Sequence, residues 1–282
     1  DVAVNHSADA VRMHAENHPA PRHLCGNVWD YAPLEVTGGR PVELLHASPT
    51  CTHFSKAKSG PLDRKEATKI RSLAWVVVRW VKEVRPRIVT LENVAAFEFW
   101  GPLTNEGKPC PKRRGLTFRR WVRAMEQEGY RVEHKLLTAC DYGAPTTRER
   151  LFVVARCDGL PIVWPAPTPG SAMWEKPYRP AAECIQWEIE CPSICGRGLT
   201  EPTMARVDRG LQKFVLDEPN PYIVDASIPW LIHRSNGERP GQAPRIYDIR
   251  EPLRTVVAEG IKQGLCRAFI GKGYGGHSSP GS

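Results

Sequence analysis

The chain has 282 residues, 41% hydrophobic and 25% charged, as expected for a soluble globular protein with one large domain or two unequal ones. Its net charge of +8 favours a polyanionic partner such as nucleic acid, although a basic protein without such a partner can have the same composition. No apolar run reaches the ~18 residues of a membrane-spanning helix, and nine scattered Cys with no secretory signal before them predict reduced thiols in a cytoplasm.

The first part of the chain alternates predicted strands with predicted helices. Strands are expected near residues 1–5, 24–28, 42–46, 87–91, 131–139 and 151–155. Helices are expected at 8–17, capped by Ser7, at 62–84 and at 117–128. This alternation favours an α/β fold with a parallel sheet and helices on both faces.

The composition and pattern of the sequence change after Cys157. Four Pro fall within residues 161–169, and short apolar stretches with many turns follow, with one helix predicted near 202–214. We therefore place a domain boundary near 158–170. The chain opens on Asp1 rather than Met and ends without a structural stop, so we expect a fragment at both ends.

One cysteine lies in a loop of distinctive composition. Residues 47–55 read ASPTCTHFS and directly follow the predicted strand at 42–46. This places the thiol of Cys51 at the carboxyl end of a strand, where open α/β sheets bind their ligands. A thiolate is a strong nucleophile, so Cys51 is a candidate for covalent catalysis. Taken alone, a Cys is more often a small buried hydrophobe.

Two further polar motifs lie beside predicted strands. Glu92 and Asn93 follow the strand at 87–91, and Arg148 and Arg150 precede the strand at 151–155. A nucleophilic Cys, an acidic Glu and paired Arg, in that order and each beside a strand, form a candidate chemical constellation. The structural alternatives are a helix-capping role for Glu92 and a surface charge cluster of the two Arg with Glu149.

Together these motifs resemble those of the cytosine-5 DNA methyltransferase family, especially its phage and prophage forms. The Pro-Cys motif with Phe-Ser after it stands at 49–55, Glu-Asn-Val at 92–94, and Gln-x-Arg-x-Arg at 146–150 with Thr146 in place of Gln. The resemblance implies a Rossmann-like S-adenosylmethionine-dependent methyltransferase fold over 1–157, lacking the first strand and its Gly-rich cofactor motif. It implies a smaller, irregular, strand-containing linker and partial target-recognition region over 158–282, without the C-terminal motifs.

The resemblance also implies a mechanism for DNA (cytosine-5-)-methyltransferase activity. Cys51 would add to C6 of a cytosine flipped out of duplex DNA, which makes C5 reactive towards a methyl donor. Glu92 would hold or protonate N3, Arg148 and Arg150 would hold O2 and favour the thiolate, and Asn93 would orient the loop.

The implied donor is S-adenosylmethionine, released as S-adenosylhomocysteine. Asn5 and Asn27 are amides at positions where the family usually has acids for the ribose and the adenine, and an amide oxygen can still accept their hydrogen bonds. The implied cofactor-binding residues are Asn5, His6, Asn27, Val28, Ser48 and Pro49.

The expected macromolecular partner is double-stranded DNA. Lys56 and Lys58, after Cys51, and Arg113 and Arg114 are candidate phosphate contacts, the latter two within a basic cluster that could also be a solvated helix face. We expect no metal, because Cys184, Cys191 and Cys195 form no Cys-x-x-Cys pair. We also expect no membrane partner, a monomer, and a place in the cytoplasm of a bacterial or phage-infected cell.

Two other functions remain open from the sequence. The same chemistry could act on cytosine in RNA, or the chain could be a catalytically inactive DNA-binding relative. Methylation of an exocyclic amine fits less well, because enzymes of that kind resemble Asp/Asn-Pro-Pro-Tyr at this loop and need no Cys.

Overall fold

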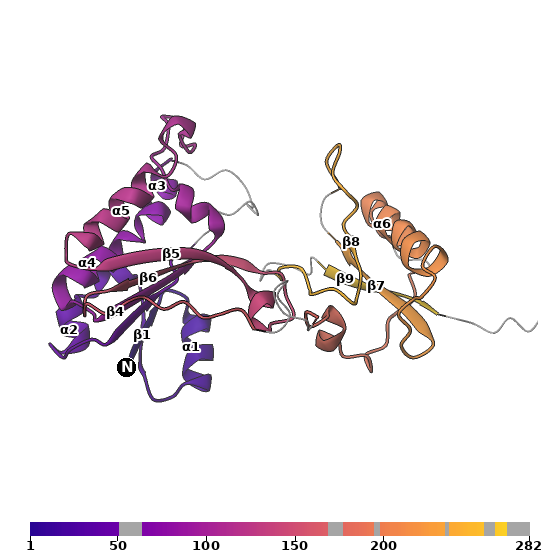
Figure 1. The fold of residues 1–282 in the computed structure, drawn as a ribbon, viewed down its shortest axis with the longest axis horizontal. Helices are drawn as coiled ribbons and strands as arrows, with labels where there is room; N and C mark the ends of the chain where they lie inside the picture. Colours follow the sequence, from indigo (N-terminus) through magenta and orange to yellow (C-terminus); the bar gives the residue numbers. More distant parts are fainter. Residues whose placement is uncertain (51–63, 169–176, 195–197, 235–236, 257–262, 270–282) are drawn as a thin grey trace, which may run out of the picture. The chain divides into compact units, whose positions relative to one another are not determined.

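The computed structural model describes residues 1–50, 64–168, 177–194, 198–234, 237–256 and 263–269. The chain divides into two compact units (Figure 1). Unit 1 comprises Asp1–Leu137 and Glu149–Pro165, and unit 2 comprises Thr138–Arg148 and Ala166–Ser282. Among the described residues, no helix is long and apolar enough to cross a bilayer.

Unit 1 contains two sheets. Its strands are β1 (Val2–Asn5), β2 (Arg22–Cys25), β3 (Leu44–Ala47), β4 (Ile88–Asn93), β5 (Arg131–Thr138) and β6 (Glu149–Arg156). β1 and β2 form a parallel pair, and the larger sheet has the order β3-β4-β6-β5. β3 and β4 are parallel, so both end at the same edge of the sheet, which we call the carboxyl edge.

The larger sheet is mixed rather than wholly parallel, which corrects the expectation from the alternating pattern. β6 runs antiparallel to β4, with Glu92 opposite Phe152 and Asn93 opposite Leu151. Parallel neighbours need a crossover connection of a dozen or more residues, usually helical. Only a short turn, η4 (Ala139–Tyr142), and a loop link β5 to β6, so no crossover helix precedes β6.

The helices of unit 1 cover both sides of these strands (Figure 1). They are α1 (Ala8–Asn17), α2 (Pro33–Thr37), α3 (Arg64–Ser72), α4 (Trp75–Val84) and α5 (Leu116–Glu126), with 3-10 turns η1 (Val28–Asp30), η2 (Ala95–Phe99) and η3 (Pro111–Arg113). Ser7 caps α1 as predicted, because its side chain accepts the N–H of Ala10.

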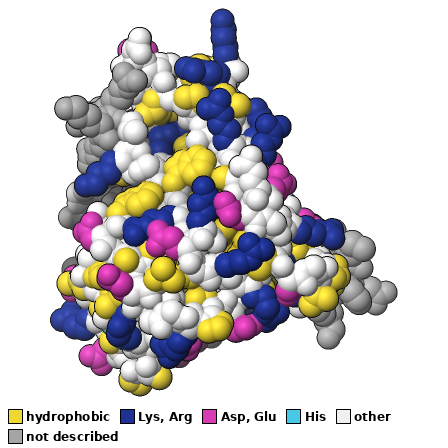
Figure 2. Space-filling model, turned by 90° about the vertical axis from the view of Figure 1, so that its left-hand side faces the viewer, with side chains coloured by type: hydrophobic (Ala, Val, Ile, Leu, Met, Phe, Trp, Pro, Cys, Tyr) yellow, Lys and Arg dark blue, Asp and Glu magenta, His cyan; other side chains and the backbone are white. Residues whose placement is uncertain are grey.

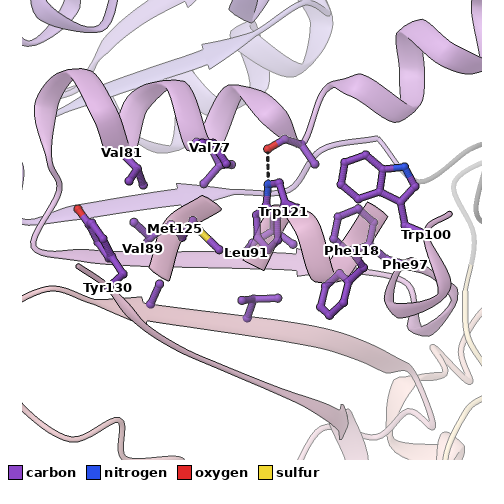
Figure 3. Packing of buried hydrophobic residues seen from close by; sticks show 14 of the residues in the cluster. Val77, Val81, Val89, Leu91, Phe97, Trp100, Phe118, Trp121, Met125 and Tyr130 are labelled. Carbon is purple, nitrogen blue, oxygen red and sulfur yellow. Dashed lines mark hydrogen bonds between the residues drawn. The ribbon is translucent and has the colours of Figure 1, made fainter. Parts of the chain in front are cut away.

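The main core lies between α4, α5 and the face of β4 and β6 that carries Leu91 and Leu151 (Figure 3). Alternate residues of β4 are buried, as the period of two of a strand requires. Phe97 from η2 stacks with Trp100 and meets Phe118 and Trp121 of α5 edge to face. This aromatic cluster fixes the segment that follows β4, and thereby the polar residues at the end of that strand.

The prediction of one long helix at 62–84 is wrong in one respect, because the structure has two helices there, α3 and α4, with a break between them. The Nε1–H of Trp121 donates to the carbonyl of Ala74 at 2.8 Å (Figure 3). Around this point the backbone bonds shorten to i→i−3, as from Val77 to Ala74. A buried indole from α5 therefore hydrogen-bonds the backbone carbonyl at the junction of the two helices.

Unit 2 is built on a three-stranded antiparallel sheet of order β8-β7-β9. Its elements are η4, η5 (Ala181–Cys184), α6 (Glu201–Leu211), the π-helical turn η6 (Gln212–Leu216), β7 (Ser227–His233), β8 (Ile246–Tyr247) and β9 (Gln263–Phe269). α6 packs on β7 so closely that a Cβ on Gly210 would lie 2.0 Å from the indole nitrogen of Trp230. The small, strand-containing second part agrees with the expected fold class.

Candidate active site

The predicted nucleophile loop begins at the carboxyl edge of β3. Ala47 pairs with Leu91, so Pro49 and Asn93 each lie two residues beyond that pair. Asn93, which is 1% exposed, donates from Nδ2 to the carbonyl of Pro49 at 2.9 Å, and its Oδ1 accepts the N–H of Val94. The amide thus joins the loop after β3 to the end of β4. Ser48 is exposed beside it, and Cys51 lies outside the described residues.

Glu92 points away from the main core, on the face opposite Asn93. The Nε of Arg150 lies 3.0 Å from Oε1 of Glu92, and both side chains are largely buried, at 18% and 24% exposed. Arg150 also donates to the carbonyl of Glu149 at 2.7 Å. Because Glu92 faces Phe152 across the antiparallel pair, Arg150 reaches it along the diagonal between strands. The structure therefore brings together two of the predicted site residues.

Two residues that the motifs do not contain share this face of the sheet. Thr90, two residues before Glu92 on β4, has its hydroxyl 2.9 Å from Nδ1 of His46 on β3. Strand periodicity could have placed Thr90 beside Glu92, but only the parallel register of β3 and β4 brings His46 to it.

The Thr-Thr-Arg-Glu-Arg motif spans the division between the two units, which falls after Arg148. In unit 2 the motif is fixed by backbone bonds. Thr147 donates to the carbonyl of Leu253 at 2.9 Å, Leu253 donates to that of Pro145, and the carbonyl of Arg148 accepts from Ala139. Arg148 and Arg150 are thus separated by the unit division although they are two residues apart. Thr146 lies in this anchored stretch and bridges to Leu253.

The predicted cofactor residues of the first sheet lie at its carboxyl end. Asn5 pairs with Cys25, and Asn27 follows two residues later. The Oδ1 of Asn5 accepts the N–H of Ser7 at 2.9 Å, and that of Asn27 accepts the N–H of Trp29 at 3.2 Å. The strand predicted to reach Val28 ends at Cys25, because Asn27 caps the turn η1.

These amides are compatible with an adenosine ligand. Asn5 and Asn27 are exposed, and in the described part of the chain neither Nδ2 has a hydrogen-bond partner. Each retains donors and an acceptor lone pair suited to hydroxyls or ring nitrogens. His6 is exposed next to Asn5, whereas the side chain of Val28 packs against Val36, Val76 and Trp80.

The predicted phosphate contacts divide into two sets. Arg113 and Arg114 are exposed at the end of η3, just before α5. Lys56 and Lys58 lie outside the described residues. The side chain of Arg113 hydrogen-bonds Cys110 and lowers the pKa of that thiol.

Comparison with known proteins identifies the family of this fold. The family C-5 cytosine-specific DNA methylase matches residues 2–190. The Type II methyltransferase M.SacI of Streptomyces achromogenes is 30% identical over 173 residues, covering 59% of this chain and 41% of that protein. M1.HphI of Haemophilus parahaemolyticus, also a Type II methyltransferase, is 30% identical over 164 residues, covering 58% of this chain and 40% of that protein.

Among solved structures, a mutant of Spodoptera frugiperda DNMT2 shares the fold, with a TM-score of 0.50 and 15% identity over 74% of this chain and 57% of that one. The chain spans about 40% of the length of the two curated relatives. The family match covers more than half of the chain and includes all three motifs at 49–55, 92–94 and 146–150. The chain belongs to the C-5 cytosine-specific DNA methylase family, whose members use S-adenosylmethionine.

Proposed function

We propose that this chain transfers a methyl group from S-adenosylmethionine to C5 of a flipped-out cytosine in duplex DNA. The observation that carries the proposal is the arrangement at the end of β4. Asn93 binds the loop that leads to Cys51, while the adjacent Glu92 is held by Arg150 on the other face of the strand.

In the proposed reaction Cys51 acts as the nucleophile. Its thiolate forms a bond from Sγ to C6 of the cytosine, and the electron pair of the C5–C6 double bond becomes available at C5. When methylation is complete, the C5 proton passes to a base and the electrons of the C5–H bond expel the thiolate, restoring the double bond. Asn93 supports this step as a positioning residue through its bond to Pro49.

Glu92 supplies the proton or hydrogen bond at N3 that absorbs the charge created by the addition to C6. Arg150 fixes the carboxyl group of Glu92, and Arg148 is assigned to O2 of the base. The positive field of the two guanidinium groups favours the thiolate form of Cys51 over the thiol.

S-adenosylmethionine, when bound, supplies an electrophilic methyl group and leaves as S-adenosylhomocysteine. We assign its ribose hydroxyls to Asn5 and its adenine to Asn27, with His6, Val28, Ser48 and Pro49 lining the site. Among the described residues the Nδ2 donors of the two amides have no partner, and both amides lie at one end of a parallel pair, which supports this assignment.

We assign catalysis to residues 1–157, and linker and target recognition to residues 158–282. The partner is double-stranded DNA, contacted by Lys56, Lys58, Arg113 and Arg114, and the protein acts as a cytoplasmic monomer without a metal. The part of unit 2 that follows Ala166 has buried clusters of its own, which supports a recognition role for it.

Trapping on DNA that contains 5-fluorocytosine tests the proposal. Fluorine at C5 prevents the final elimination, so a working enzyme remains covalently bound to its substrate. With S-adenosylmethionine present, the chain should form a denaturation-resistant adduct on duplexes with varied cytosine contexts, and Cys51→Ala should form none. Cys25→Ala, which removes an exposed thiol on β2, is the matched control and should trap normally.

Three other outcomes would contradict the proposal. An adduct that persists in Cys51→Ala would exclude this nucleophile. Trapping on RNA but not on DNA would favour the RNA substrate. Sequence-dependent DNA binding without any adduct would favour an inactive DNA-binding relative.

A further inference from the structure

A basic patch covers the loop before α5 and the solvent-facing side of that helix. Residues 105–123 contain seven cationic side chains and one acid, Glu106. All seven cations are exposed: Lys108, Lys112, Arg113, Arg114, Arg119, Arg120 and Arg123. The other face of α5 is buried through Phe118, Trp121 and Met125, and the exposed side of the helix carries three cations and, at its last residue, the acid Glu126.

The charges of this patch have no acidic partner among the described residues. None of the seven cations forms an ion pair with Asp or Glu in the part that the structure describes. Elsewhere in the chain, exposed Arg residues such as Arg12 and Arg131 pair with a nearby carboxylate. Seven unpaired cations on one surface repel one another, which favours a polyanion as the partner.

The loop that carries the first four cations is fixed to the core. Gly115 donates to the carbonyl of Phe99, and Thr117 and Phe118 donate to that of Trp100. At Gly101 a Cβ would lie 2.2 Å from the carbonyl oxygen of Arg113, so only glycine permits the two segments to approach so closely. The patch is thus preorganised and is not a set of charges on a loosely held loop.

The side chains within the patch form a continuous surface. The guanidinium of Arg114 lies 3.5 Å from the ring centroid of Phe99, a stacked position that fixes its direction. A guanidinium nitrogen of Arg119 lies 2.9 Å from the place a Cβ would take on Gly115, next to Arg114. The charge therefore runs from η3 onto the first turns of α5 without a gap.

Topology places this patch near the carboxyl edge of the sheet. β4 ends there at Asn93, η2 follows directly, and α5 then runs back to the start of β5 at the opposite edge. In Figure 1 the loop before α5 lies at the upper end of unit 1, and Figure 2, seen from the left-hand side of Figure 1, shows several Lys and Arg side chains near the top, with others scattered below. The loop before α5 therefore lies at the same end of the sheet as Glu92 and residues 48–50, although α5 packs on the face of β4 opposite the Glu92 side chain.

We propose that this patch binds the phosphate backbone of duplex DNA outside the target cytosine, independently of base sequence. The inference rests on the proposed function only for the orientation of the duplex relative to the candidate site. Binding of the phosphates by the patch requires no catalysis. α5 is about 16 Å long at 1.5 Å per residue, enough to follow several phosphates of one strand. Arg and Lys that contact phosphates give affinity and orientation rather than sequence readout.

A pair of triple variants tests the proposal. The patch variant carries Arg113→Gln, Arg114→Gln and Arg120→Gln. The control variant carries Arg12→Gln, Arg40→Gln and Arg131→Gln, which removes the same charge from exposed sites of unit 1 outside the patch. Unchanged thermal unfolding midpoints show that both are folded. The probe is an alternating dA-dT duplex of about three helical turns, which contains no cytosine and therefore reports backbone binding alone.

Affinity falls as salt increases, and the slope of log affinity against log salt should be less steep in the patch variant. The slope should decrease in magnitude by about 0.9 for each phosphate contact removed, up to about 2.7 for three contacts. The control variant should keep the slope of the parent chain. Equal slopes in the two variants would overturn the proposal, as would a patch-dependent preference for duplex RNA of the same length. If the parent chain forms no adduct with 5-fluorocytosine DNA but the two variants still differ in their salt dependence, the proposed function is refuted and this inference stands.

Discussion

Arg150 on β6 contacts Glu92 on β4 with Nε and Oε1 3.0 Å apart, and Asn93, the next residue along, binds the carbonyl of Pro49. Neighbouring residues of one strand thus point to opposite faces and hold two different parts of the site. The carboxyl group of Glu92 is fixed by Arg150 from β6, which is antiparallel to β4. The loop after β3 is fixed by Asn93 from β4, which is parallel to β3. The mixed sheet makes both contacts possible at a single strand end.

Glu92→Gln should slow methyl transfer by about 10²–10⁴-fold, the usual contribution of a positioned acid. The amide keeps the size of the side chain but cannot deliver the proton to N3. Single-turnover transfer of labelled methyl groups to duplex DNA measures the effect. Glu43→Gln is the control. It changes an exposed carboxylate that pairs with Arg87, and this variant should transfer methyl groups at the parent rate. A wild-type rate in Glu92→Gln would remove this residue from the acid role.

Asn93→Ala should reduce methyl transfer while leaving binding of a cytosine-free duplex unchanged. The substitution leaves the carbonyl of Pro49 without its donor and should lower the free energy of unfolding by about 1–3 kcal/mol. Asn17→Ala removes a comparable amide-to-carbonyl bond on the exposed end of α1 and should change neither property by much. Asn93→Asp should not restore transfer, because a carboxylate has no N–H to donate. Full transfer by Asn93→Ala would contradict the positioning role.

The sequence predicted the local features of this fold better than the tertiary ones. Ser7 and its helix follow from a local cap, and the apolar runs at 87–91 and 151–155 predicted the two strands that the structure places at 88–93 and 149–156. The break between α3 and α4 could not be predicted, because it depends on an indole from α5. The contact of Arg150 with Glu92 likewise requires the β4–β6 register, which no local pattern encodes.

The sequence names candidate site residues but does not indicate how they are arranged. The motifs name Glu92, Asn93, Arg148 and Arg150, yet nothing in their spacing indicates that Arg148 belongs to unit 2 and Arg150 to unit 1. The anchoring of this motif by Leu253 is a contact between segments far apart in the chain. Likewise, the amides Asn5 and Asn27 each cap a local turn in addition to any contact with a ligand.

Trp121→Phe should destabilise unit 1 by about 1–3 kcal/mol, since the ring volume is mostly kept but the buried carbonyl of Ala74 loses its donor. Urea unfolding followed by far-UV circular dichroism measures the change. Trp164→Phe is the matched control, because its Nε1 bond to Glu133 is only partly buried and water can replace it. If the two variants unfold at the same urea concentration, the Trp121 bond does not stabilise the junction of α3 and α4.

The stability of unit 2 should fall as the pH decreases from about 4.5 to about 2. The buried guanidinium of Arg206 contacts Glu238 at 2.6 Å and lowers the pKa of that carboxyl group to about 2. A carboxyl group with a lower pKa in the folded state stabilises the fold above its unfolded pKa, and this contribution is lost as the pH falls through the folded value.

Urea unfolding of the full chain at stepped pH measures this loss, with residues 227–233 followed by pulsed hydrogen exchange at one fixed labelling pH. Glu238→Gln should be less stable at neutral pH, because it removes the carboxylate that the buried Arg206 contacts, and its midpoint should vary less between pH 4.5 and 2. Glu251→Gln, at an exposed carboxylate, is the control and should follow the parent curve. A parent-like pH dependence in Glu238→Gln would assign the acid sensitivity of unit 2 to other carboxyl groups.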